Sequence, residues 1–136
     1  MKKLNCDRAS ERGGAGIKFL LVFLVLVVLG NAGLNYLPVA YQGASFKQEM
    51  DTAVVKALAS SGRIRPLDVA TATIRKASTD YDIPEDAYID IKPVSGGVVE
   101  AHVAYSREVN MLPFGLYKHN YNFDYVARPT GYLLKQ

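Results

Sequence analysis

The chain has 136 residues, of which 49% are hydrophobic and 21% are charged, which is enough for one membrane segment and one domain of about 100 residues. Its formal net charge of +3 comes from the N-terminus: five basic and two acidic residues lie within the first 18 positions, and the totals of 16 and 13 leave eleven of each for the rest. A neutral domain without a basic cluster argues against nucleic acid as a partner.

Residues 1–16 form a basic tail in front of an apolar segment. Short basic flanks stay on the cytoplasmic side of a membrane, and only the N-terminal flank has a basic excess here. We therefore expect a bacterial inner-membrane protein with a cytoplasmic N-terminus and with residues 39–136 in the periplasm or outside the cell. The single cysteine, Cys6, lies in the tail, so no disulfide within the chain is expected.

A transmembrane helix is predicted over residues 17–38. The run Phe19–Leu29 is apolar without interruption, but it reaches only about 16 Å as a helix, against about 30 Å of hydrocarbon in a bilayer. The span must therefore continue to Pro38, which is expected to end or kink the helix. Three side chains are predicted to anchor it at the membrane interfaces: Lys18 on the inner side, and Tyr36 and Tyr41 on the outer side.

A cleaved signal peptide is the alternative to a retained anchor. An apolar core of this length fits a signal sequence, and Gly30, Asn31 and Ala32 offer small residues for cleavage after Ala32. The charged leader is long for a signal peptide, which favours the anchor.

Small and polar residues in the second half of the span suit packing against another helix in lipid. Asn31 and Asn35 are one helical turn apart, with glycines nearby. The candidate helix–helix contact consists of Gly30, Asn31, Gly33 and Asn35. In the other interpretation, both amides lie in the hydrated outer interface and contact no helix.

Two helices are predicted after the span. Apolar residues recur at helical spacing from Ala44 until the segment Ser60-Ser61-Gly62, and a second pattern begins at Pro66, a favoured first-turn residue, and ends before Pro84. The second pattern is shorter and richer in threonine.

Beyond Pro84 the period changes to two, which predicts three strands: Ala87–Lys92, Val98–Asn110 and Tyr117–Tyr125. Hairpin turns are expected at residues 95–97 and 112–115, and residues 128–131 are expected to close the sheet. The predicted fold is α+β: an N-terminal transmembrane helix, then two helices packed on a three-stranded antiparallel sheet.

The sequence contains no recognisable catalytic motif. Neither His102 nor His119 has a second histidine or a cysteine nearby, so a zinc site would have to recruit a carboxylate such as Asp90 or Glu100. We expect no catalytic residues, no metal and no cofactor, and we expect the protein not to be an enzyme.

An aromatic stripe follows the third strand. It contains Tyr117, His119, Tyr121, Phe123 and Tyr125. Aromatic residues favour strands and fill cores, so the inward face of the sheet is the preferred interpretation. The functional alternative is a binding face for a glycan or peptide, formed by Tyr117, Tyr121 and Tyr125.

The order of a charged tail, an apolar helix running into an amphipathic helix and a small sheet is similar to type IV pilins and pseudopilins. In that family a processing glycine is followed by an apolar segment with Glu at its fifth position. The corresponding residues here are Lys18, Phe19 and Leu21, counted from Gly13, Gly14 and Gly16. The resemblance is therefore one of architecture, without the glutamate on which the family's filament assembly depends.

The chain more closely resembles a family of uncharacterised single-pass bacterial membrane proteins with a short exported domain. The stretches that carry this resemblance are Gly16–Phe19, Tyr36–Tyr41, Ser45–Gln48 and Tyr121–Tyr125. None of them is a catalytic motif, and the family has no established activity, so the resemblance implies topology alone.

We therefore expect the exported domain to work through contacts, as a non-catalytic structural or assembly component of an envelope complex. The expected partners are the lipid bilayer and a membrane or periplasmic protein, with a homo-oligomer as one option. The alternative is a pilin-like or glycan- or peptide-binding module that uses the sheet face and is released after signal-peptide cleavage.

Overall fold

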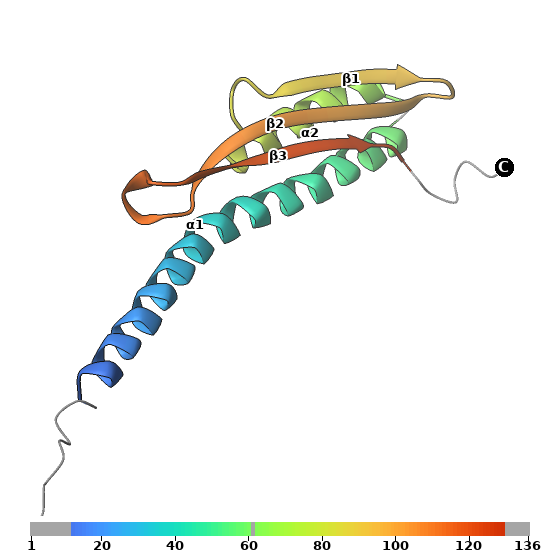
Figure 1. Ribbon diagram of the computed structural model, residues 1–136. Coiled ribbons are helices and arrows are strands. Elements are labelled where there is room, and N and C mark those ends of the chain that lie inside the picture. The colour runs from blue at the N-terminus through green and yellow to red at the C-terminus, as the bar shows by residue number, and fades with distance from the viewer. Residues whose placement is uncertain (1–11, 61, 130–136) are drawn as a thin grey trace, which may run out of the picture.

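A long helix, a shorter helix and a three-stranded antiparallel sheet make up the fold (Figure 1). The structure is a computed structural model that describes residues 12–60 and 62–129. Its elements in chain order are α1 (Arg12–Ala59), α2 (Pro66–Asp80), β1 (Tyr88–Val94), β2 (Val98–Asn110), the 3-10 helix η1 (Pro113–Gly115) and β3 (Lys118–Ala127). The α+β class and the order of elements predicted from periodicity are confirmed. The tail up to residue 11, with Cys6, and the last two residues of the expected closing segment 128–131 lie outside the described residues.

The predicted transmembrane segment and the first helix of the domain are one continuous element. α1 has 48 residues, and Pro38 lies inside it. The helix therefore does not end at Pro38, one of the two outcomes expected there, and no separate helix begins at Ala44. Proline removes one backbone hydrogen bond, but a helix bends without ending when its neighbours favour helix, as Leu37 and Ala40 do. Figure 1 shows α1 curving between its free N-terminal half and the half that runs along the sheet.

The sheet has the strand order β1-β2-β3, so each hairpin joins neighbouring strands. β2 is the longest strand and pairs antiparallel with both others. Gly96 and Gly97, in the turn between β1 and β2, have φ values of 85° and 76°, which glycine adopts readily. β1 extends past the predicted end at Lys92 to include Pro93, which an edge strand accommodates because one side of its backbone is unpaired.

One face of the sheet packs against both helices and forms the core. The main buried cluster draws on all layers: Phe46, Met50, Ala53, Val54, Ile74, Ala77, Ala101, Val103, Tyr105, Phe123 and Ala127. The ring of Phe46 on α1 lies 5.8 Å from that of Phe123 on β3. No described helix covers the opposite face of the sheet (Figure 1).

The N-terminal half of α1 lies outside this core. Almost all its large apolar side chains between Ile17 and Leu29 are exposed, on every side of the helix. α1 is the one helix in the described part of the chain that is long and apolar enough to span a membrane, and none of the side chains in its most apolar window is buried in the protein. Such a surface is far larger than the scattered apolar residues of a water-exposed helix.

Replacing Phe46 by alanine tests the packing between α1 and the sheet. The ring is fully buried, so Phe46→Ala should lower the free energy of unfolding by about 3–5 kcal/mol through lost burial and the cavity left behind. Phe114→Ala is the matched control: its ring is 98% exposed, and the expected change is within about 0.5 kcal/mol. Urea unfolding of the full chain in detergent micelles, followed by near-ultraviolet circular dichroism, measures both. Equal effects would contradict this core.

Candidate functional site

The turn between β2 and β3 reaches α1 in the middle of the predicted span. The side-chain Nδ2 of Asn31 donates a hydrogen bond to the backbone carbonyl oxygen of Met111 at 3.4 Å, across 80 positions of the chain. Asn35 lines the same hollow as Pro113 and Phe114 of the turn. Both amides therefore lie on the side of α1 that faces the turn.

Aromatic rings continue this contact along the helix. The ring centroid of Tyr36 lies 6.2 Å from that of His119 and 6.1 Å from that of Tyr121, both on β3. Gly43 is buried under Tyr121, and a Cβ at this position would collide with the Tyr121 hydroxyl. Any side chain at this position would therefore force the Tyr121 ring to shift away from the helix.

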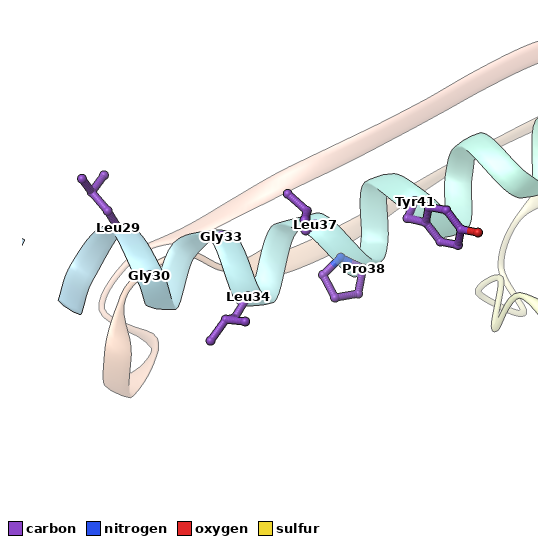
Figure 2. Close-up of a pocket in the computed structure, with 7 residues that line it drawn as sticks. All are labelled: Leu29, Gly30, Gly33, Leu34, Leu37, Pro38 and Tyr41. Carbon is purple, nitrogen blue, oxygen red and sulfur yellow. The ribbon is translucent and has the colours of Figure 1, made fainter. Parts of the chain in front are cut away.

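The side of α1 turned away from the sheet carries an open apolar groove (Figure 2). Its lining consists of Leu29, Gly30, Gly33, Leu34, Leu37, Pro38 and Tyr41. A Cβ added at Gly30 or Gly33 would meet no atom within 4 Å, so the packing of the chain itself requires glycine at neither position. The four residues predicted to form one helix–helix contact are thus divided: the glycines line the groove, and the asparagines face the turn.

The three predicted interface anchors have different surroundings. Lys18 is exposed, and Tyr41 is 74% exposed at one end of the groove. Tyr36 is half-buried against β3. Two of the three side chains are therefore free to reach a membrane interface, while the third mainly packs within the protein.

The tyrosines of the predicted binding face do not share one exposed surface. Tyr117 is 54% exposed next to the turn, whereas Tyr121 and Tyr125 are half-buried against α1. The Tyr125 hydroxyl donates a hydrogen bond to Asp51 Oδ1 at 3.0 Å, and Lys47 Nζ lies 4.4 Å from the centroid of the same ring. A sugar or peptide would find one freely exposed tyrosine here and no continuous aromatic platform.

Burial also changes the acidity of the inward tyrosines. It raises the pKa of the Tyr105 phenol to about 12 and raises the pKa of Tyr121. For Tyr125, burial and then the hydrogen bond to Asp51 raise the pKa. These phenols stay neutral at physiological pH and serve as packing surface.

Polar side chains occupy the open face of the sheet. His102 Nε2 lies 2.7 Å from Asp124 Oδ1, and the His102 ring packs edge-on against Tyr88 with centroids 5.5 Å apart. The hydrogen bond between Lys92 and Asp90 lowers the pKa of the carboxyl and raises that of the ammonium. Within the described residues, no three His, Cys, Asp or Glu side chains come together as metal ligands. The contacts of His102 with Tyr88 and Asp124 instead connect β2 to both of its neighbouring strands, while Asp90 and Lys92 pair along β1.

One contact across three elements was not predicted from the sequence. Arg107 stands at an inward position of β2, and its Nη1 donates to Gln42 Oε1 on α1 at 3.1 Å while Nη2 donates to Asp82 Oδ2 at 3.1 Å, after α2. Asp82 has a positive φ of 53°. The sequence signal for this contact is an arginine in the apolar register of a strand, which requires polar partners on the helices.

Comparisons of the chain with protein-family models, with curated proteins and with solved structures found no match. The functional argument therefore depends on the surfaces of the molecule. They are the exposed apolar half of α1, the groove on its outer side and the turn that packs against its inner side.

The close approach at Gly43 can be tested by adding a single methyl group. Gly43→Ala should lower the free energy of unfolding by about 1–3 kcal/mol through overpacking, and a second change, Tyr121→Phe, should restore part of the loss because it removes the hydroxyl. Gly33→Ala is the matched control, since its Cβ has open space and alanine favours helix. Urea unfolding in detergent measures all three. If Gly43→Ala were as stable as Gly33→Ala, the contact would be wrong.

Proposed function

We propose that this chain is a single-pass protein of the bacterial inner membrane whose periplasmic α+β domain is a non-catalytic structural or assembly component of an envelope complex. One observation carries the proposal: the exposed apolar half of α1 continues as the same helix into the core of the domain. A partner that binds the helix in the bilayer therefore also positions the domain.

The charge distribution supports a cytoplasmic N-terminus. Basic residues are in excess only ahead of the apolar half of α1, and the remainder of the chain is neutral. Positive flanks are retained on the cytoplasmic side during insertion, whereas a neutral domain offers no resistance to export.

Retention of the anchor is supported by the contacts around the alternative cleavage site. Cleavage after Ala32 would remove Asn31, which is hydrogen-bonded to Met111. It would also leave a new chain end inside α1, one turn before Tyr36 and its ring contact with Tyr121.

The groove on α1 supports a helical partner within the membrane. Helices in lipid associate through close van der Waals packing at small residues, and Gly30 and Gly33 open the surface of α1 at the centre of the groove. The partner is another membrane protein or a second copy of this chain. A pilin-like subunit is the second candidate function, favoured by the unbroken course of α1 from its apolar half into the core.

The topology predicts how single cysteines react with a membrane-impermeant maleimide. In spheroplasts, Cys6 should be labelled only after the membrane is permeabilised, while Ser95→Cys in a Cys6→Ser background should be labelled at once because Ser95 is exposed in the β1–β2 turn. The reverse pattern would contradict the orientation. A chain whose mass shows that residues 1–32 are gone would contradict the retained anchor.

Filling the groove should release the partner without unfolding the protein. A leucine at position 33 would occupy the groove, so Gly33→Leu should weaken association by about 1–3 kcal/mol, which is roughly fivefold to 150-fold. Affinity purification of the tagged full chain from detergent, with mass spectrometry and a differently tagged second copy, measures the loss. Gly16→Leu is the matched control, on the same helix but outside the groove. Equal recovery of partners with both variants would contradict the proposed contact.

A further inference from the structure

The turn between β2 and β3, residues 111–117, presents the most exposed large apolar side chains in the described part of the sheet domain. Phe114 is 98% exposed and Leu116 is 78% exposed. Phe114 also has a φ of 65°, a left-handed conformation that is unfavourable for a bulky residue. Packing within the chain does not explain an aromatic residue at this position. We therefore ask which molecule outside the chain the Phe114 ring contacts.

This turn lies beside α1 at membrane depth. Counted from Lys18, a hydrocarbon core of about 30 Å takes up about 20 helical residues and ends near Pro38. Asn31, which holds Met111 of the turn, lies only about 20 Å along that path. A tilted helix needs more residues to cross, which would place Asn31 deeper still. The hydrogen bond between the Asn31 amide and the Met111 carbonyl reduces the cost of polar groups at such depth.

We propose that the β2–β3 turn is a second membrane contact, which inserts Phe114 and Leu116 into the outer leaflet of the bilayer beside α1. Lipid fits this surface because the apolar tip is followed by Tyr117 and Lys118, an aromatic and a basic residue of the kind found at membrane interfaces. Lys118 pairs with Glu108 at 2.9 Å, so its charge has a partner where the two strands leave the turn. The inference rests on the proposed function, because it requires α1 to span the bilayer.

A second contact has a consequence for the whole domain. With α1 alone in the bilayer, the tilt of the helix and the height of the sheet above the membrane are set by the helix alone. Insertion of the turn adds a second contact beside α1, which restricts the tilt of the helix and so holds the domain at a defined angle to the membrane. The fold itself keeps the groove on the side of α1 away from the turn.

Single tryptophans test the proposal, because the natural chain contains none. Three full-length variants are reconstituted separately in phosphatidylcholine vesicles: Leu24→Trp in the span, Phe114→Trp at the tip, and Val94→Trp at the opposite end of the sheet. Quenching by lipids brominated along the acyl chains reports contact with the bilayer. We expect Leu24→Trp and Phe114→Trp to lose most of their emission and to emit at shorter wavelength, and Val94→Trp to emit as in water. Leu116→Trp should repeat the result of Phe114→Trp.

The span variant is the reference for the tip. Counted from Lys18, Leu24 lies about 9 Å and Asn31 about 20 Å along a core of about 30 Å, so each is about 5 Å from its middle. Bromines in the acyl chains should therefore quench Leu24→Trp and Phe114→Trp to a similar extent. The inference is overturned if Leu24→Trp is quenched while Phe114→Trp and Leu116→Trp behave like Val94→Trp, or if the tip tryptophans are shielded from acrylamide but not quenched by lipid, which would indicate a protein contact. Absence of quenching at Leu24→Trp would overturn the membrane span itself.

Discussion

The continuity of α1 across Pro38 is the constraint on which the other features of this protein depend. Its N-terminal half exposes apolar side chains on every side, as lipid would require, while its C-terminal half buries one stripe that includes Phe46 and Met50. Because side chains on one helix keep fixed directions relative to each other, the stripe on the sheet also sets where Gly30 and Gly33 point. A helix broken at Pro38 would leave these two directions independent.

The sheet strengthens this coupling by extending along the helix instead of sitting beyond its end. Gly43 lets β3 approach the helix closely. The Tyr121 ring also contacts Tyr36, which lies about two helical turns before Gly43 on α1. Arg107 ties β2 to the same side of α1 through Gln42. The β2–β3 turn is thereby brought next to Asn31, inside the length of helix that a bilayer would cover. The predicted anchor and the predicted domain therefore overlap along the chain's axis, and the boundary assigned at residue 38 separates parts that pack together.

Periodicity predicted the helices and strands because the core is one-sided, so a buried residue such as Phe123 alternates with the exposed polar residues Asn122 and Asp124. It did not show that α1 continues through Pro38, where the helical preference of Leu37 and Ala40 outweighs the one backbone hydrogen bond that proline removes. Periodicity also did not indicate that Gly30 and Gly33 line the groove while Asn31 and Asn35 face the turn. Asn31 contacts Met111, 80 positions away in the chain, and helical spacing gives no information about so distant a contact. Arg107 was missed for the same reason, since its partners lie on other elements.

The distribution of polar pairs limits where this molecule makes contacts. On the open face of the sheet, His102 is paired with Asp124 and Lys92 with Asp90, so a partner there would have to desolvate charges that already have partners, with little gain. The groove and the tip of the turn carry apolar side chains instead, so contact with lipid or with a helix there requires no desolvation of paired charges. Both lie where α1 would emerge from the outer leaflet, and on different sides of it. A lipid contact at the turn would therefore leave the groove available to the proposed helical partner.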